Sequence, residues 1–272
     1  MEGLQERLGK LAIIGGGQMG EAIVAGLVHG ALFDADNVYV AEPFENRREL
    51  LSEQYGVHCV EDGSMIDNPE TVILAVKPQI FRDVAAELAE LANFSPKRVV
   101  SIAAGISTAV MLEYFADCAV VRVMPNINLI VSAGMSVVAP AEGTPHKEAE
   151  LVSDLFNLMG EAVIIEEQLI NAATAINGSG PAFFALFTEE LAQSGIAQGL
   201  PEEIAWQLAR QTIIGTGRSL ELRDISPAEL RAAVTSPNGT TQAALECFEA
   251  QQFGIVVNNA FIACLNRAEE LG

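Results

Sequence analysis

The sequence predicts an α/β fold, in which an N-terminal domain of residues 1–165 is followed by an all-helical domain of residues 166–272. Short runs rich in Val and Ile alternate with helical stretches up to about residue 165. This pattern is typical of a parallel sheet that helices cover on both faces. Beyond that point the strand pattern stops. A glycine-rich turn follows the first apolar run and opens a helix, which predicts a ligand-binding turn at the edge of the sheet.

Each strand of the first domain is predicted from an apolar run bounded by turn-forming residues. The predicted strands are Lys10–Ile14, Asn37–Ala41, Thr71–Val76, Arg98–Ala103, Ala119–Met124, Met135–Ala139 and Ala162–Ile165. Helical spacing between them predicts helices at Gln18–Gly30, Glu45–Tyr55, Ile80–Leu91 and Lys147–Met159. In the second domain the predicted helices are Leu169–Gly195, Pro201–Leu222, Pro227–Val234, Thr240–Ala250 and Gly254–Leu271.

Charge and cysteine usage exclude several kinds of function. The 272 residues carry 36 Asp and Glu against 15 Lys and Arg, and the net charge of −21 argues against nucleic acid or an anionic membrane as partner. The apolar runs are too short to span a bilayer, and the N-terminus has no signal-peptide pattern. No histidine clusters with the cysteines, so we expect neither a metal site nor a disulfide framework, and a cytoplasmic location. The cysteines, far apart, are Cys59, Cys118, Cys247 and Cys264.

The last predicted helix indicates self-association. Its residues 254–265 are apolar around most of the helix circumference, and such a helix must be buried on all sides. Because a small helical domain cannot easily cover it alone, we expect a homodimer formed through the C-terminal helices. Packing of this helix against the first domain is the alternative.

The turn Gly15–Gly20 has the G-x-G-x-x-G spacing of a dinucleotide site, directly after a strand and before a helix. Gly15 permits the tight turn, Gly17 lets the main chain approach a pyrophosphate, and Gly20 lets helix and strand pack closely. The N-terminus of the helix adds N–H groups and partial positive charge for the phosphates. The sequence therefore predicts a dinucleotide bound at this turn.

Glu42 ends the second predicted strand, 22 residues after Gly20. A carboxylate at this position can accept hydrogen bonds from the adenosine ribose and would repel a 2′-phosphate, which favours NADH over NADPH. Arg47 and Arg48 follow closely and could reverse this preference by reaching back. A solvated helix face is the interpretation that we favour for both arginines.

Two segments of the second domain depart from ordinary helix sequence. Ile176–Pro181 places Gly, Ser and Pro inside an apolar helical run, which indicates close packing or a ligand. Thr235–Thr241 brings hydroxyls and an Asn-Gly pair to a helix start, either as a nest of donors for an anion or as ordinary capping by Ser236 or Thr240. Because this domain has no lysine, main-chain amides and hydroxyls are its natural anion donors.

Six motifs, in order along both domains, give the sequence a specific resemblance to a known family. They are Gly15–Gly20, Ala75–Pro78, Ser101–Gly105, Arg122–Asn126, Gly178–Ala182, and Leu230-Arg231 leading into Thr235–Thr241. On these residues the chain resembles pyrroline-5-carboxylate reductase along essentially its whole length. The resemblance implies an N-terminal Rossmann-type domain and a C-terminal all-helical dimerisation domain that often assembles further. It also implies NAD(P)H-dependent reduction of 1-pyrroline-5-carboxylate to L-proline, the last step of proline biosynthesis.

The resemblance also assigns site residues. The dinucleotide would be lined by Gly15, Gly17, Gln18, Met19 and Gly20, by Ala75, Val76, Lys77 and Pro78, and by Ile102, Ala103 and Ala104. Asp62 stands where the family commonly has asparagine, and a second acid would again disfavour a 2′-phosphate. The turn formed by Ser236, Asn238, Gly239, Thr240 and Thr241 would hold the substrate carboxylate. The Thr241 hydroxyl, the candidate catalytic group, would orient the ring nitrogen.

Several positions depart from the family pattern: Asn128, Asn177, Phe183, Ser226 and Asn238. Asparagine tolerates a positive φ better than other non-glycine residues, so we expect the turn at Asn238 to survive. The three histidines, His29, His58 and His146, lie outside every motif. An enzyme that binds an already protonated imine relies on positioning more than on a strong acid, so we place no histidine in the site.

Two other interpretations are open, and a third lacks the acid–base group that it needs. A β-hydroxyacid dehydrogenase shares the two-domain plan but uses a lysine on its first interdomain helix, and here no lysine occurs beyond residue 147. A reductase of a related six-membered cyclic imine keeps the same site chemistry. A dinucleotide-binding sensor without turnover keeps the same fold, and substrate-dependent NADH oxidation separates it from an enzyme.

Overall fold

The computed structural model describes residues 2–29 and 33–271 and divides into two compact units. The first unit comprises Met1–Ser179 and Cys264–Gly272, and the second comprises Gly180–Ala263. The boundary predicted after residue 165 follows the end of the last strand. The first unit nevertheless continues through residues 166–179, which the prediction assigned to the second domain. In this segment α7 (Ile170–Asn177) packs against β7 (Gly134–Pro140) through a small apolar cluster that includes Ile170 and Val137.

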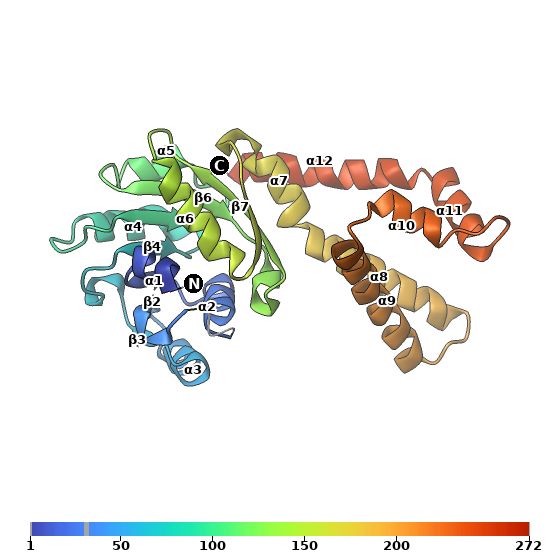
Figure 1. The fold of residues 1–272 in the computed structure, drawn as a ribbon, viewed down its shortest axis with the longest axis horizontal. Helices are drawn as coiled ribbons and strands as arrows, with labels where there is room; N and C mark the ends of the chain where they lie inside the picture. Colours follow the sequence, from blue (N-terminus) through green and yellow to red (C-terminus); the bar gives the residue numbers. More distant parts are fainter. Residues whose placement is uncertain (1, 30–32, 272) are drawn as a thin grey trace. The chain divides into compact units, whose positions relative to one another are not determined.

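One eight-stranded sheet forms the centre of the first unit (Figure 1). The strand order is β3-β2-β1-β4-β5-β6-β7-β8, and all pairs from β3 to β6 are parallel. The other strands are β1 (Leu11–Ile14), β2 (Val38–Ala41), β3 (His58–Val60), β4 (Thr71–Leu74), β5 (Arg98–Ser101), β6 (Ala119–Met124) and β8 (Gly160–Ile164). The predicted Rossmann-type α/β domain is therefore confirmed, and every predicted strand is present, six of the seven with slightly different ends.

Two features of the sheet differ from the prediction. The sequence does not predict β3, because three residues at the sheet edge, beginning with an exposed histidine, form no apolar run. The expectation of an all-parallel sheet is wrong at β7, which pairs antiparallel with β6. Residues 125–133 connect these two strands. They are fewer than the roughly dozen residues that a parallel crossover needs.

Helices cover both faces of the sheet, as the buried Val and Ile runs predict. Along β1, Leu11 and Ile13 belong to one hydrophobic core, whereas Ala12 and Ile14 belong to the other. The first core includes side chains of α1 (Glu2–Leu8), α2 (Gln18–His29), α3 (Glu45–Tyr55) and α6 (His146–Asn157), and the second includes those of α4 (Phe81–Ala89) and α5 (Thr108–Leu112). The sequence does not predict α1 and α5. Gly30, the last residue of the predicted helix at 18–30, lies outside the described residues.

Short 3-10 helices lie in the loops between these elements. They are η1 (Ala35–Asn37), η2 (Gly63–Met65), η3 (Pro78–Ile80), η4 (Ile127–Val131) and η5 (Glu167–Leu169). Because η2 and η3 follow strands of the parallel part of the sheet, they belong to the edge at which the carboxyl ends of the strands meet. In open α/β sheets this edge binds ligands.

The predicted helix Leu169–Gly195 is two helices. α7 ends at Asn177, a turn follows at Gly178 and Ser179, and α8 (Gly180–Ala197) begins directly after it. Pro181 has no N–H with which to continue the helical ladder to the Asn177 carbonyl. The side-chain amide of Asn126 donates to that carbonyl instead, at 3.0 Å. This break explains the Gly-Ser-Gly-Pro sequence, which would be costly inside a helix.

The second unit is helical. It contains α8, α9 (Glu202–Arg223), α10 (Pro227–Ala233), α11 (Thr240–Ala250) and the first part of α12 (Phe253–Leu271). α8 and α9 pack through the buried Ala192, Ala205 and Ala209. α10 begins with a capping box, in which the Ser226 hydroxyl accepts from the Glu229 N–H and the Glu229 carboxylate accepts from the Ser226 N–H. These hydrogen bonds from Ser226 hold the pKa of Glu229 below its usual value. Ser226, which departs from the family pattern, therefore serves as the N-cap of α10.

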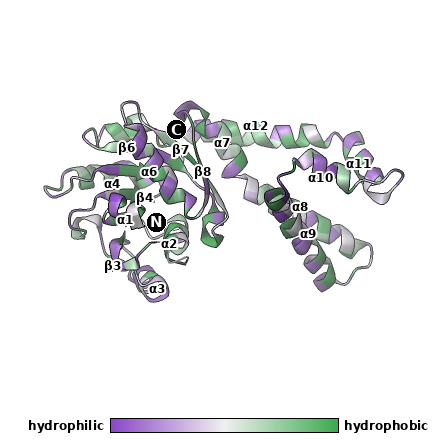
Figure 2. Ribbon diagram, viewed as in Figure 1, coloured by the Kyte–Doolittle hydropathy of each residue, from purple (hydrophilic) through white to green (hydrophobic). Residues whose placement is uncertain are grey.

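Many large apolar side chains of the second unit are exposed, and hydrophobic residues run along its helices in Figure 2. Among them, Phe184 is 65% exposed and Val256 is 60% exposed. Apolar surface of this extent marks a site of protein association. Within the described residues, no helix combines the length and the apolarity that crossing a membrane requires.

Candidate functional site

The glycine loop, residues 15–20, connects β1 to α2 and includes the first three residues of that helix. Gly15 has a φ of +107°, and a Cβ added to it would lie 2.7 Å from the Ala75 carbonyl oxygen. A Cβ added to Gly20 would overlap the Gly15 carbonyl oxygen. A Cβ added to Gly17, by contrast, would meet no atom within 4 Å. Two glycines are therefore needed for packing inside the protein, and the third faces open space.

The neighbouring strand ends lie beside this loop because β4 and β5 follow β1 in the sheet. The Ala75 N–H donates to the Ile14 carbonyl at 2.8 Å, and the Ile102 N–H donates to the Leu74 carbonyl at 3.1 Å. The structure thus brings Ala75–Pro78 and Ile102–Ala104 to the same edge as the glycine loop. Of these residues Lys77 is exposed, whereas Ile102 and Ala103 are buried.

Glu42 follows β2 and is only 5% exposed. Its Oε2 accepts the Gly16 N–H at 2.8 Å, and its Oε1 accepts the Phe44 N–H at 3.1 Å. Each carboxylate oxygen therefore has a main-chain partner within the protein. Sequence reasoning placed Glu42 at this edge of the sheet but missed its contact with the glycine loop.

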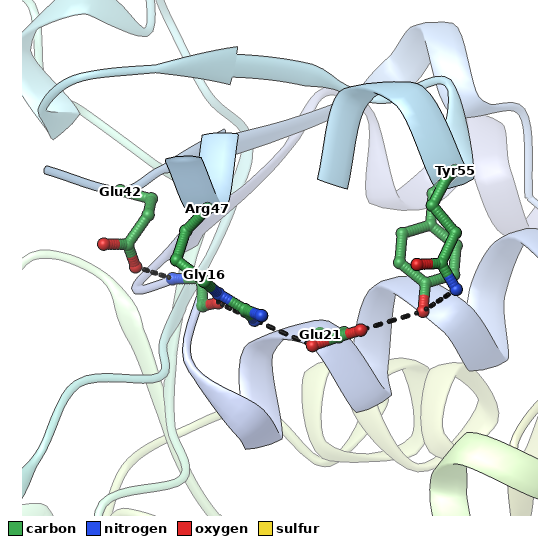
Figure 3. A network of polar contacts seen from close by, with 6 residues as sticks. Gly16, Glu21, Glu42, Arg47 and Tyr55 are labelled. Atoms are coloured by element: carbon green, nitrogen blue, oxygen red, sulfur yellow. Dashed lines mark hydrogen bonds and ion pairs between the residues drawn. The ribbon is translucent and has the colours of Figure 1, made fainter. Parts of the chain in front are cut away.

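Arg47 reaches back to the glycine loop, so the expected solvated helix face is wrong for this residue. Its Nη2 donates to the Gly16 carbonyl at 2.6 Å and to Glu21 Oε2 at 2.7 Å (Figure 3). Arg48 is also partly buried, and its Nη1 donates to the carbonyls of Glu42 and Pro43 at 2.8 and 2.7 Å. Both guanidinium groups therefore hold main-chain carbonyls around the loop.

Three other predicted dinucleotide residues lie at the same edge in different environments. Asp62 is exposed and caps η2, where its Oδ1 accepts the Ser64 N–H at 2.8 Å. Gln18, the first residue of α2, is exposed. Met19 is half-buried and packs against the first hydrophobic core.

A pair of buried asparagines, which sequence reasoning did not connect, joins the end of β6 to α7. Asn177 Nδ2 donates to the carbonyls of Met124 and Met135 at 2.8 and 3.1 Å. Asn126 Nδ2 donates to the Asn177 carbonyl, and its Oδ1 accepts the N–H groups of Asn128 and Met135. Together these hydrogen bonds anchor the last helix before the unit boundary. The Pro-Asn and Asn-Gly-Ser-Gly sequences were visible as motifs, but their contact was not.

The candidate anion turn, residues 236–241, follows α10 in the second unit and includes the first two residues of α11. Asn238 has a φ of +56°, as expected of an asparagine in this turn. Its N–H donates to Gln242 Oε1 at 2.8 Å, and the Gly239 N–H donates to the Ser236 carbonyl at 3.0 Å. Ser236 and Thr240 are exposed, and Thr241 is half-buried. Hydroxyls and the N-terminus of α11 therefore meet at one solvent-facing turn.

The glycine loop and the neighbouring strand ends have features that fit a bound dinucleotide. A backbone turn with open space at Gly17 precedes the N-terminus of α2, a helix of 12 residues (Gln18–His29). Such a helix end binds phosphate through its free N–H groups and partial positive charge. Among residues 2–29 and 33–271, no group of three or more His, Cys, Asp and Glu could hold a metal ion.

The two histidines with described side chains, His58 and His146, both belong to the first unit. His58 is in β3, with a half-exposed side chain, and Nε2 lies 3.8 Å from Asp36 Oδ1. His146 begins α6 and is exposed beside Glu150. The side chain of His29 lies outside the described residues.

Two family models match the chain. One, described as pyrroline-5-carboxylate reductase dimerisation, matches residues 167–271. The other, described as NADP oxidoreductase coenzyme F420-dependent, matches residues 10–105. The first match covers the helices with exposed apolar side chains, and the second covers the glycine loop and the ends of β4 and β5.

Similar proteins match nearly the whole chain. This chain is 38% identical over 264 residues to a pyrroline-5-carboxylate reductase of Synechocystis, and the matched region covers 97% of this chain and 98% of that relative. Its structure is similar to that of a pyrroline-5-carboxylate reductase from Coxiella burnetii, with a TM-score of 0.88 and 31% identity over 97% of this chain and 99% of that one. It is also similar to a Plasmodium falciparum pyrroline carboxylate reductase with NADP bound, with a TM-score of 0.84 and 26% identity over 97% and 98% of the two chains.

Proposed function

The chain belongs to the pyrroline-5-carboxylate reductase family, and from this premise we propose how its residues divide the work of reducing a cyclic imine. The protein is an NAD(P)H-dependent oxidoreductase that reduces 1-pyrroline-5-carboxylate to L-proline. The observation that carries this conclusion is 38% identity over 97% of the chain, which spans both units. A six-membered cyclic imine is the alternative substrate, and a sensor without turnover is the alternative class.

The glycine loop and its neighbours bind the dinucleotide in this proposal. Gly17, Gln18, Met19 and Gly20 present main-chain N–H groups to the pyrophosphate, and α2 adds its partial positive charge. Gly15, whose N–H donates to the Ala41 carbonyl at 2.8 Å, forms the tight turn that precedes them. Ala75, Val76, Lys77, Pro78, Ile102, Ala103 and Ala104 form the turns that line the rest of the cofactor. When bound, NAD(P)H supplies the hydride that reduces the C=N carbon of the substrate.

Glu42 and Asp62 determine the proposed mild preference for NADH. Both carboxylates lie at the edge that would receive the adenosine ribose, and both would repel a 2′-phosphate. Glu42 is 5% exposed, and both of its carboxylate oxygens already accept main-chain N–H groups. We therefore assign its effect on cofactor preference mainly to its negative charge and less to a direct hydrogen bond from Glu42 to the ribose. Arg48 opposes the preference, since its guanidinium lies beside Glu42 at the carbonyls of Glu42 and Pro43.

The turn of Ser236, Asn238, Gly239, Thr240 and Thr241 holds the substrate carboxylate in this proposal. The exposed hydroxyls of Ser236 and Thr240 and the free N–H groups at the start of α11 suit an anion, and the unit has no lysine to do so. Thr241 directs its hydroxyl to the ring nitrogen and serves as the candidate catalytic group. Positioning of a protonated imine, rather than an acidic side chain, then provides the main rate enhancement.

The protein is a homodimer, and we propose that the dimer forms through its C-terminal helices. The exposed apolar side chains of α8, α9 and α12 support this, because an isolated protomer leaves them in water. The proposed location is the cytoplasm. Its support is that all four cysteines are free, as in proteins of reducing compartments.

Steady-state kinetics test the proposed function. We expect oxidation of NADH and NADPH that depends on 1-pyrroline-5-carboxylate, and a much lower kcat/KM for the six-membered imino acid. Preferred reduction of the six-membered ring would contradict the substrate assignment. Dinucleotide binding without turnover of either imine would identify a sensor.

A further inference from the structure

Gly16, the middle residue of the glycine loop, is held from both sides of its main chain (Figure 3). Its N–H donates to Glu42 Oε2 at 2.8 Å. Its carbonyl oxygen accepts from Arg47 twice, from Nη2 at 2.6 Å and from Nε at 3.2 Å. Glu42 follows β2 and Arg47 lies in the first turn of α3, so two consecutive elements grip one residue of the loop.

We propose that Glu42 and Arg47 form a brace, in which each is a positioning residue that sets the orientation of the glycine loop for the dinucleotide pyrophosphate. This inference rests on the proposed function in one respect, namely that the loop binds NAD(P)H. It assigns both side chains to the loop itself and to neither the nicotinamide nor the substrate.

The brace determines where the next amide points. A peptide unit is planar and trans, so the Gly17 N–H points opposite to the Gly16 carbonyl. Since Arg47 holds that carbonyl, the Gly17 N–H is directed away from Arg47. Gly17 is also the loop glycine at which a Cβ would meet no atom within 4 Å, so its surroundings leave room for a phosphate.

Further contacts hold the brace in place. Glu21, in the first turn of α2, accepts from Arg47 Nη2 through Oε2 at 2.7 Å and from the Tyr55 hydroxyl through Oε1 at 3.1 Å. The side chains of Arg47 and Glu21 are 30% and 20% exposed, so water screens this pair less than an ion pair on the surface. A Cβ on Gly16 would lie 2.8 Å from a methyl carbon of Leu51, which closes the remaining side of the residue.

The brace differs from direct recognition of a 2′-phosphate by Arg47. A phosphate ligand would act on NADPH alone, whereas a brace acts on the pyrophosphate that both cofactors share. The geometry favours the brace, because Nη2 and Nε of Arg47 already donate to Gly16 and Glu21.

Binding of NADH, NADPH and ADP-ribose to the full-length protein, followed by nucleotide fluorescence or competition, tests the brace. Arg47→Met keeps the aliphatic stem and removes every donor. We expect its Kd for all three ligands to rise by about 10- to 100-fold, since the loop loses charge-assisted hydrogen bonds. Arg47→Lys, which keeps one charged donor, should recover part of the affinity. The kcat at saturating NADH and the KM for the imine should stay within about twofold of the parent protein.

Arg82→Met is the matched control. Arg82 forms a half-exposed ion pair with Glu113 at 2.9 Å in the same unit, on α4, and its loss should leave every Kd unchanged. Weakened binding of NADPH alone in Arg47→Met would overturn the brace and make Arg47 a 2′-phosphate ligand. Unchanged binding of all three ligands would overturn it as well. These Kd values are measured without the imine, so they test the brace even if turnover of 1-pyrroline-5-carboxylate fails.

Amide hydrogen exchange keeps the inference testable if Arg47→Met does not fold. In the parent protein without nucleotide, the Gly16 amide should exchange slowly, because it donates to a carboxylate that is 5% exposed. Rapid exchange at Gly16 would show that the grip does not persist in solution and would overturn the proposal.

Discussion

Gly17→Ala should separate cofactor binding from folding. Gly17 is exposed, its φ is not positive, and an added Cβ would meet no atom within 4 Å. Alanine therefore fits the backbone, and the free energy of unfolding should change by less than about 1 kcal/mol. The new methyl group would instead occupy the space that a pyrophosphate needs to approach the loop.

The expected loss of affinity follows from the contacts that the methyl group prevents. Loss of one charge-assisted hydrogen bond costs about 1.5–3 kcal/mol, which corresponds to about a 10- to 100-fold rise in Kd for NADH. Fluorescence titration of the bound nicotinamide measures this change, and thermal unfolding measured by circular dichroism follows stability.

Gly20→Ala is the matched control for Gly17→Ala. A Cβ on Gly20 would overlap the Gly15 carbonyl, which is main chain and cannot rotate away. This variant should lose about 1–3 kcal/mol of stability from overpacking. A Gly17→Ala protein that binds NADH as tightly as the parent would refute the placement of the pyrophosphate, and a loss of stability equal to that of Gly20→Ala would refute the open space at Gly17.

Four further predictions concern the remaining residues. Thr241→Val should lower kcat/KM for 1-pyrroline-5-carboxylate by about 10- to 100-fold through loss of a hydrogen bond to a charged group, with the Kd for NADH unchanged; parent-like kinetics would remove Thr241 from the site. Glu42→Ser should raise the KM of both cofactors, because Gly16 loses its carboxylate partner, and should shift the kcat/KM ratio toward NADPH, whereas an unaltered ratio would contradict the charge argument. Asn177→Ala should destabilise the protein by about 1–3 kcal/mol in urea unfolding, because it leaves two partly buried carbonyls without their donor, and a smaller change would show that water replaces the amide. Sedimentation at micromolar concentration should show at least a dimer, and a compact monomer would contradict the interface assigned to the C-terminal helices.

The local sequence was sufficient to predict most of the sheet and the glycine loop. Strands such as Leu11–Ile14 and Val38–Ala41 are continuous apolar runs, and G-x-G-x-x-G between a strand and a helix carries its own geometry. The edge strand His58–Val60 carries no such signal, because its side chains are exposed or half-buried. The antiparallel pairing of β7 depends on the length of the connection from β6, which a reading of apolar runs alone does not use.

The candidate site was predicted less completely than the sheet, because it depends on contacts between residues that are far apart in the sequence. Arg47 has the spacing of a helix surface, yet its long side chain reaches Gly16, which lies 31 positions away. Asn126 and Asn177 bond across 51 positions, and nothing in either local sequence indicates that pairing. The helix break at Gly178 was visible as an anomaly, and Pro181 explains it locally, but the partner of the Asn177 carbonyl, the distant Asn126 amide, was not visible.

A crystal structure with NAD⁺ and L-proline bound would test the central claim most directly. The account predicts that the proline carboxylate lies in the turn of residues 236–241, within hydrogen-bond distance of its amides and hydroxyls, and that the Thr241 hydroxyl faces the ring nitrogen. A carboxylate bound elsewhere, with this turn in contact only with solvent, would contradict it.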